Sequence, residues 1–298
     1  MRRALLAAIA AVAVGCSGAN PPGPGPSPGP PPPTSVGILA GAGDIAECSS
    51  PGAEATARLL DRISGTIFTA GDNAYPDGSA ANFRDCYDPT WGRHKERTRP
   101  TPGNHDYALE PHNGAAYYDY FGANAGPRGA GYYSYSVGNW RIFALNSEIA
   151  TGAGSAQAQW LRDELAQFPT QCSAAIWHKP LFTSGPNGDN PHMLDIWRIL
   201  YDANVDIIIN GHDHVYERFA PQDPNGRPDV ARGIRQFTVG TGGVPLYSFV
   251  TTKPNSEVRA TVWGVIVLFL GDGNYEWDFQ PAGIPGVNFR DTGRGTCH

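Results

Sequence analysis

Three long apolar runs in this chain each end in a glycine that is followed by an aspartate or a histidine. The runs are VGILAGAGD (36–44), TIFTAGD (66–72) and DIIINGHDH (206–214). Continuous apolar runs of this kind are typical of strands that are buried on both faces. Between the first two runs, AEATARLLDRI (53–63) has the spacing of an amphipathic helix. The pattern therefore predicts a strand–helix–strand unit whose two strands run parallel.

Strand patterns and helical patterns continue to alternate along the chain. The further predicted elements are a hairpin with Gly-Asn at its turn (132–147), a helix (155–168), a strand (172–179), a helix (191–205), a strand (235–243) and a hairpin with Asp-Gly at its turn (261–281). Residues 73–131 are rich in glycine, proline and aromatic residues, which predicts mostly loops. We expect an α/β fold with either one mixed sheet or two stacked sheets, and with helices outside.

The first 16 residues have the features of an export signal. Residues 1–3 are basic at two positions, and residues 4–14 form an apolar stretch that is too short to span a membrane. Cys16 follows a small residue, which resembles a bacterial lipoprotein signal, although Ala13 stands where leucine is usual. We predict a signal peptide with a lipobox (1–16) and an exported protein. A cell-surface lipoprotein is the favoured form, and a secreted protein that is cut elsewhere is the alternative.

A segment rich in proline and glycine (17–35) follows the signal. Its glycines keep no period of three, so it is not collagen-like, and it has too few apolar side chains to bury a core. We predict a disordered linker, which either tethers the folded part or has no role of its own. The remaining residues, 36–298, form one predicted domain.

Four cysteines remain besides Cys16, and an even number in an exported chain indicates two disulfides. Four cysteines allow three pairings. We favour Cys48 with Cys86, because each lies in a loop shortly after a motif that we place at one site. That choice leaves Cys172 with Cys297, a bond that would fix the C-terminal residues. The chain has no Cys-x-x-Cys, which argues against a structural zinc site.

Residues able to bind metal ions gather at the predicted strand ends and in one loop. The clusters are Gly43-Asp44, Gly71-Asp72-Asn73-Ala74-Tyr75, Pro102-Gly103-Asn104-His105-Asp106, Trp177-His178 and Gly211-His212-Asp213-His214. Each cluster alone also occurs in ordinary turns and cores. Ligands of open α/β sheets bind beyond the carboxyl ends of the strands, which is where most of these side chains would meet. Their joint occurrence predicts a metal site.

This ordered series of motifs resembles that of the calcineurin-like metallophosphoesterases, and the match covers most of residues 36–280. The tyrosine of GDNAY and the Tyr-Glu-Arg after the last histidine make the purple acid phosphatases the most similar branch. The resemblance implies a four-layer sandwich, in which two stacked mixed β-sheets are flanked by helices. It also implies two metal ions, of which the first would be held by Asp44, Asp72, Tyr75 and His214, and the second by Asp72 as a bridge with Asn104, His178 and His212.

The same resemblance implies the metals and the reaction. Tyr75 would select ferric iron, whereas the neutral Asn104 suits a divalent ion such as iron, zinc or manganese in the second site. A metal-bound hydroxide would attack phosphorus, with the two ions about 3.5–4 Å apart across Asp72. His105 would contact the phosphate or protonate the leaving oxygen. His192 is a second candidate for that work, and its other interpretation is that it belongs to the start of a helix.

Three acids and one basic run close to these motifs have two interpretations each. Asp106, Asp213 and Glu217 would orient the metal ligands, or they are solvated loop acids. For the basic run RHKERTR (93–99), we favour the interpretation as a solvated helix face. The alternative is a role in attracting an anionic substrate.

We predict that the protein is an exported phosphatase that hydrolyses phosphate monoesters. A metal-dependent phosphodiesterase of the same fold is the runner-up, because the loops that choose the substrate cannot be aligned. A surface-tethered binding module without turnover is a further alternative, against which the complete ligand set argues. The net charge of −6 argues against nucleic-acid binding. We expect a monomer that contacts a membrane only through a lipid on Cys16.

Overall fold

The computed structural model describes residues 37–283 and 288–298 of the chain. The predicted signal peptide (1–16) and linker (17–35) lie outside the described residues. Within the described ranges, no helix combines the length and the apolar character that crossing a membrane requires.

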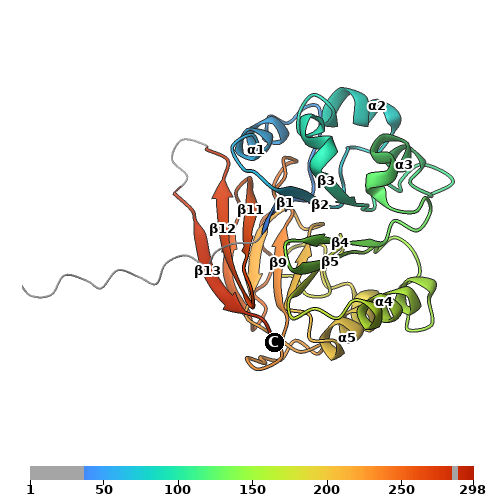
Figure 1. Cartoon of the computed structure of the whole chain (residues 1–298). Coiled ribbons are helices and arrows are strands. Elements are labelled where there is room, and N and C mark those ends of the chain that lie inside the picture. The colour runs from blue at the N-terminus through green and yellow to red at the C-terminus, as the bar shows by residue number, and fades with distance from the viewer. Residues whose placement is uncertain (1–36, 284–287) are drawn as a thin grey trace, which may run out of the picture. The chain divides into compact units, whose positions relative to one another are not determined.

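The first of two mixed β-sheets has six strands in the order β13-β12-β11-β1-β2-β3 (Figure 1). The strands are β1 (Gly37–Ala42), β2 (Thr66–Ala70), β3 (Thr98–Thr101), β11 (Gly264–Leu270), β12 (Asn274–Pro281) and β13 (Asp291–Thr296). β1 and β2 run parallel with a helix between them, so the predicted strand–helix–strand unit is confirmed. β3 continues the parallel set, and β11 pairs with β1 in the opposite direction.

The second sheet has seven strands in the order β10-β8-β9-β7-β6-β5-β4. These strands are β4 (Tyr133–Val137), β5 (Trp140–Ala144), β6 (Ser173–Ile176), β7 (Ile207–Asn210), β8 (Tyr216–Phe219), β9 (Arg235–Val239) and β10 (Ser256–Ala260). β5, β6, β7 and β9 are parallel to one another. The carboxyl ends of three central strands of this sheet, β6, β7 and β9, therefore lie at one edge.

Helices cover the outer face of each sheet (Figure 1). α1 (Gly52–Leu60), α2 (Ala80–Asn82) and α3 (Ala115–Phe121) lie on the side of the first sheet, and α4 (Ala156–Gln167) and α5 (Leu194–Asp202) on the side of the second. α4 begins where the sequence predicts, because Ser155 Oγ accepts a hydrogen bond from the backbone N–H of Ala158 at 3.1 Å. Such an N-cap is worth about 1 kcal/mol. The helices and sheets form the predicted four-layer sandwich.

The apolar residues divide into three buried clusters that match these layers. Leu39 and Phe68 of the first sheet and Ile209 of the second belong to the cluster between the sheets. Leu60 of α1 packs in a second cluster on the outer face of the first sheet, and Trp197 of α5 in a third on the outer face of the second sheet. Burial on both faces explains why the central strands read as continuous apolar runs.

The basic run 93–99 packs against the end of α1, with Arg93 and Glu96 exposed and its other residues partly or fully buried. It lies in a 3₁₀ helix (Trp91–Arg97) and the start of β3. Arg97 donates hydrogen bonds to the carbonyl oxygens of Leu60 and Ile63 at 2.8 and 2.7 Å. Leu60 is the last residue of α1, and Ile63 lies in the turn that follows it. Arg93 forms ion pairs with Glu54 and Asp61 on and after α1. The run is therefore engaged in the fold, and the interpretation as an attractor of substrate gains no support.

Both favoured disulfide pairings are confirmed. Cys48 is bonded to Cys86, and Cys172 to Cys297. The second bond joins the start of β6 to the C-terminal residues, as predicted. Asp206 also attaches the C-terminal residues to the start of β6, because its carboxylate accepts hydrogen bonds from the backbone N–H groups of Ser173 and His298, both at 2.9 Å.

Candidate metal centre

The seven predicted metal ligands converge beyond the carboxyl ends of five strands. Asp44 follows β1, Asp72 and Tyr75 follow β2, Asn104 follows β3, His178 follows β6, and His212 and His214 follow β7. The first three of these strands are parallel neighbours in one sheet, and the last two are parallel neighbours in the other. The two sheets are stacked, so their carboxyl edges meet and bring residues from distant parts of the chain together.

The chain turns sharply at three of these strand ends. Asp44, Asp72 and His212 have φ angles of 59°, 50° and 71°, in the left-handed region that residues other than glycine rarely adopt. Such conformations persist where the surrounding structure enforces them, often at functional sites. Gly211 shows how close the strand ends approach. A Cβ on it would lie 2.5 Å from Ala70 O and 2.6 Å from Asp44 Oδ2.

Three of the other side chains gather around the phenol oxygen of Tyr75. This oxygen lies 3.0 Å from Asp44 Oδ1, 3.0 Å from Asp72 Oδ2 and 3.2 Å from His214 Nε2. Tyr75 and these three side chains are all buried. Two carboxylates, a phenol and an imidazole thus point at one small volume, and together they form the Tyr75 group.

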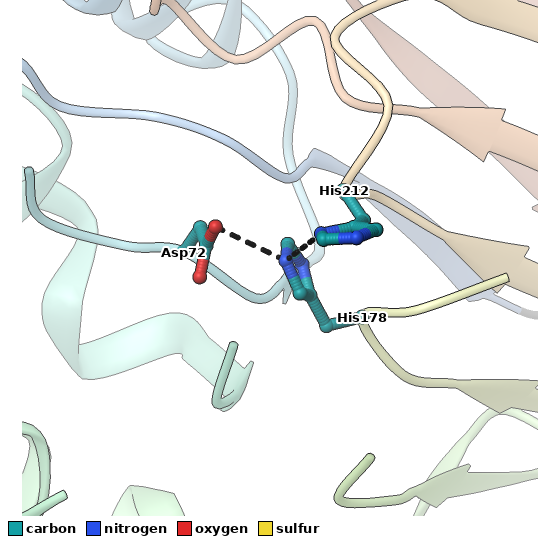
Figure 2. Close-up of side chains that lie close together, drawn as sticks. All are labelled: Asp72, His178 and His212. Atoms are coloured by element: carbon teal, nitrogen blue, oxygen red, sulfur yellow. Dashed lines mark hydrogen bonds and ion pairs between the residues drawn. The ribbon is translucent and has the colours of Figure 1, made fainter. Parts of the chain in front are cut away.

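A second set gathers around Nε2 of His178, and Figure 2 shows Asp72 and His212 of this set beside it. This nitrogen lies 3.1 Å from Asp72 Oδ2, 3.2 Å from Asn104 Oδ1 and 3.2 Å from His212 Nδ1. We call Asp72, Asn104, His178 and His212 the His178 group. Asp72 Oδ2 belongs to both groups, because it is the same oxygen that lies beside the Tyr75 phenol. One carboxylate oxygen therefore stands between two clusters of ligand atoms.

The two groups perturb one another's protonation. Burial opposes ionisation of Asp72, yet the charge and hydrogen bond of His178 hold the pKa of Asp72 well below its usual range. Burial alone would lower the pKa of His178, but the carboxylates of Asp72 and Asp44 raise that pKa to about 10. Burial and the charge on His178 together lower the pKa of His212 to about 3. Burial and the nearby carboxylates raise the pKa of Tyr75 well above its usual value.

These donor atoms fit metal ions. Oxygen donors from carboxylates and a phenol make the Tyr75 group suitable for a hard cation, and imidazole and amide donors make the His178 group suitable for a borderline divalent ion. Ionised carboxylates that are buried together need positive charge nearby, which a cation would supply.

Two of the histidines have their rings oriented by backbone carbonyls. His178 Nδ1 lies 2.9 Å from Ala70 O, and His214 Nδ1 lies 2.8 Å from Pro245 O. A carbonyl can only accept, so Nδ1 carries a proton. When the ring loses its second proton to bind a cation, the lone pair is on Nε2. That nitrogen is the one facing the other ligand atoms in each group. This arrangement is usual for histidines that bind metal ions.

The three acids predicted to orient the ligands anchor the loops that carry them. Asp106 accepts hydrogen bonds from the backbone N–H groups of Asn73 and Gly103 and so joins the loops after β2 and β3. Asp213 accepts from the Thr183 hydroxyl at 2.5 Å and Asn187 N at 3.0 Å.

Glu217 likewise accepts from Ser184 N at 2.8 Å. All three acids are buried, which excludes the alternative of solvated loop acids.

His105 lies at the more exposed side of the two groups. Its side chain is 35% exposed, and its ring packs against the ring of Tyr75 with centroids 4.2 Å apart. Its Nδ1 contacts Pro76 O, and its Nε2 lies 3.9 Å from Asp72 Oδ2. Asn104 and His212 are also only partly buried, so solvent reaches this side of the site.

His192 is not brought into either group. It lies in a 3₁₀ turn (Pro191–Met193) before α5, which agrees with the interpretation that it belongs to a helix start. Across the described ranges, no hydrogen bond or ion pair joins its side chain to any of the seven predicted ligands. It lies instead beside Lys179 and Glu148, which form an ion pair with 2.6 Å between Nζ and Oε2. Its catalytic role stays a prediction.

Sequence reasoning missed two contributors to the site. Lys179 directly follows His178, so its ion pair with Glu148 stands next to the His178 group. The loop after β9 supplies Pro245, whose carbonyl orients His214, and Tyr247, whose ring stacks on His214. The signal for the loop was present, because strand 235–243 ends in Thr-Gly-Gly at the same edge of the sheet as β6 and β7.

Comparison with known proteins identifies the family of this chain. Residues 40–216 match the family described as Calcineurin-like phosphoesterase. Purple acid phosphatase 21 of Arabidopsis thaliana is 29% identical over 239 residues, which cover 70% of this chain and 52% of that protein. Purple acid phosphatase 15 of the same plant is 30% identical over 156 residues, which cover 46% of this chain and 29% of that protein. The structure of purple acid phosphatase PPD1 from yellow lupin (Lupinus luteus) seeds is similar with a TM-score of 0.73 and 20% identity, over 86% of this chain and 53% of that one.

These similarities differ in what they establish. The likeness to the lupin structure supports the fold alone at this level of identity. The chain spans about half or less of the length of the two curated relatives. The family match, however, covers more than half of the 298 residues, and its span from 40 to 216 contains all seven residues of the Tyr75 and His178 groups. The chain belongs to the calcineurin-like phosphoesterase family.

Proposed function

We propose that this chain binds two metal ions and hydrolyses phosphate monoesters. The observation that carries the proposal is the position of Asp72 Oδ2, 3.0 Å from the Tyr75 phenol oxygen and 3.1 Å from His178 Nε2. A carboxylate shared between two ligand groups reduces the repulsion between two neighbouring cations. Neither group alone would explain why both converge on this one oxygen.

The Tyr75 group would hold the first ion and the His178 group the second. A phenolate is a hard, anionic donor, so ferric iron is the proposed first ion. Asn104 contributes a neutral oxygen, so the second group carries less negative charge and suits divalent iron, zinc or manganese. When bound, such a pair of ions supplies a nucleophile from water and neutralises charge on the phosphoryl group.

His105 is the proposed contact to the substrate. Its Nδ1 is held against the carbonyl of Pro76, which fixes the ring and leaves Nε2 on the partly exposed side of the site. From there Nε2 can hold a proton and donate it to a phosphoryl oxygen or to the leaving oxygen. General acids of this kind contribute about 10²- to 10⁴-fold to the rate.

A hydrolysis assay tests the proposal. A chromogenic phosphomonoester and its bis-ester are each offered to the full chain with and without a chelator. We expect turnover of the monoester that chelation abolishes. Preferred turnover of the bis-ester would instead establish the phosphodiesterase alternative. If neither ester is turned over in a metal-dependent way, that result would contradict an enzymatic role and favour the binding module without turnover.

A matched pair of histidine variants tests the role of His105. His105→Ala should lower monoester turnover by at least about 100-fold. His112→Ala is the control, because His112 lies in the same loop with its side chain 59% exposed and paired with Glu110. If His105→Ala keeps the full activity that is expected of His112→Ala, His105 takes no part in the reaction.

Export and a lipid anchor on Cys16 are part of the proposal. Two disulfides are typical of proteins that fold in an oxidising compartment, which supports export. Fractionation of cells that express the full chain is the test. Cys16→Ala should move a membrane-bound protein into the soluble exported fraction. A wild-type protein that is already soluble after export would contradict the anchor, and size-exclusion chromatography would test the expected monomer.

A further inference from the structure

The loop that follows β9 holds His214 at three points. The backbone N–H of Tyr247 donates to His214 O at 3.0 Å. The carbonyl of Pro245 accepts from His214 Nδ1 at 2.8 Å. The ring of Tyr247 stacks on the imidazole, with centroids 3.9 Å apart and an angle of 12° between the planes. The backbone, the proton position and the face of this histidine are all determined by one short segment.

The same segment is attached to the rest of the site. Gly242 N donates to Gly43 O at 2.8 Å, and Val244 N donates to Asp44 O at 3.2 Å. Thr261 Oγ1 donates to Tyr247 O at 3.1 Å. The loop is therefore fixed to Gly43 and Asp44, directly after β1. These hydrogen bonds allow the loop to act as a support for His214.

The ring of Tyr247 restricts tilting of the His214 imidazole. The bond to Pro245 O allows the ring of His214 to tilt about the Nδ1 direction. Stacking on Tyr247 covers one face, and the edge-on ring of Tyr75, with centroids 6.0 Å apart and an angle of 86°, lies on another side. The imidazole is thus held with Nε2 directed at the Tyr75 phenol oxygen.

We propose that Tyr247 is a positioning residue whose ring, and not its hydroxyl, keeps His214 aligned and so slows the loss of the ion from the Tyr75 group. This inference rests on the proposed function, because it requires that the Tyr75 group binds an ion. Substitution of groups that orient metal ligands typically weakens metal binding about 10- to 100-fold.

Iron retention in the full chain tests the proposal. Wild type, Tyr247→Phe, Tyr247→Leu and Tyr247→Gln are loaded with iron, and its release to a chelator is followed by absorbance. Tyr247→Phe keeps the ring and should release iron within about twofold of wild type. Tyr247→Leu should release it at least about tenfold faster. Tyr247→Gln removes the aromatic face but stays polar at this half-buried position, so it serves if the leucine variant folds poorly.

A control in the same loop separates positioning from loop damage. Phe249 lies two residues further on, beneath the guanidinium of Arg259 at 6.0 Å, and Phe249→Leu should release iron at the wild-type rate. A rate for Phe249→Leu as fast as that for Tyr247→Leu would overturn the proposal. So would a rate for Tyr247→Leu equal to that of wild type.

A second readout needs no metal. In the metal-free protein, the stacked tyrosine should shift the ring-proton resonances of His214 upfield, and Tyr247→Leu should remove that shift while Tyr247→Phe keeps it. An unshifted His214 resonance in wild type would contradict the stacked geometry. A wild-type protein that binds no ion would overturn both the proposed function and this inference. Tight binding that is equal in wild type and Tyr247→Leu would overturn the inference alone.

Discussion

The phenol oxygen of Tyr75 lies 3.0 Å from Oδ2 of Asp72, three residues earlier in the chain. The contact arises because Asp72 is in the left-handed conformation and the chain then pairs with the loop after β1, where Tyr75 N donates to Ala46 O at 2.8 Å. The loop therefore folds back and places the ring of Tyr75 beside the carboxyl end of β2. The spacing in GDNAY is what places a phenol and a carboxylate in contact at this strand end.

Tyr75→Phe should abolish the visible colour of the iron-loaded protein. The colour is expected to arise from charge transfer between the phenolate and ferric iron, and phenylalanine has no oxygen to bind the ion. The absorption spectrum of each purified, iron-loaded variant is the measurement. Tyr107→Phe is the control, because Tyr107 is also buried but bonds to Tyr118 and Asn146. An unchanged spectrum in Tyr75→Phe would refute its assignment as a ligand.

Asp72→Asn should remove both activity and bound metal. The amide keeps the size of the side chain but loses the negative charge that both ligand groups share. Metal content by elemental analysis should fall below one ion per chain, and monoester turnover should fall by more than about 100-fold. Asp85→Asn is a suitable control, because Asp85 is exposed and pairs only locally with Arg84. Full occupancy of two ions in Asp72→Asn would contradict the bridging role.

The central part of the fold could be predicted because its signals are local. The apolar runs of β1, β2 and β7 are buried on both faces, so their composition alone marks them as strands. The ligand motifs could be predicted for the same reason, since the side chains that bind and the glycines that turn the chain are neighbours in sequence. Parallel pairing then brings the strand ends together.

The missed elements lie where local signals are weak. β3 contains Pro100 and β13 contains two glycines, and both are edge strands, where such residues are tolerated. The support for His214 was missed for a different reason. Pro245 acts through its backbone carbonyl, which every residue has, and Tyr247 acts through a contact between loops that no spacing in the sequence marks.

Gly211→Ala should disrupt the site while a similar change elsewhere does not. The added Cβ would lie 2.5 Å from Ala70 O and 2.6 Å from Asp44 Oδ2. Neither the backbone of Ala70 nor the buried carboxylate of Asp44 can move away freely. Overpacking of this kind typically costs about 1–3 kcal/mol. Gly152→Ala is the control, because no atom lies within 4 Å of a Cβ added there. Urea unfolding and metal content measure the two effects, and wild-type values for Gly211→Ala would show that the strand ends are not so closely packed.

Removal of the Cys172–Cys297 disulfide should lower the free energy of unfolding more than removal of Cys48–Cys86. The first bond closes 125 residues and the second 38, and the chain-entropy estimate then differs by about 1 kcal/mol within a usual range of about 2–4 kcal/mol. The double serine variants at each pair, compared by urea unfolding, are the measurement.

Asp206 keeps its hydrogen bonds to Ser173 N and His298 N in the variant without the Cys172–Cys297 bond, so the C-terminal residues should stay attached in the native state. The loss should therefore appear in stability, with metal content unchanged, because the Cys172–Cys297 bond lies at the opposite end of β6 from His178. A loss of bound metal in that variant would show that the C-terminal residues support the centre after all.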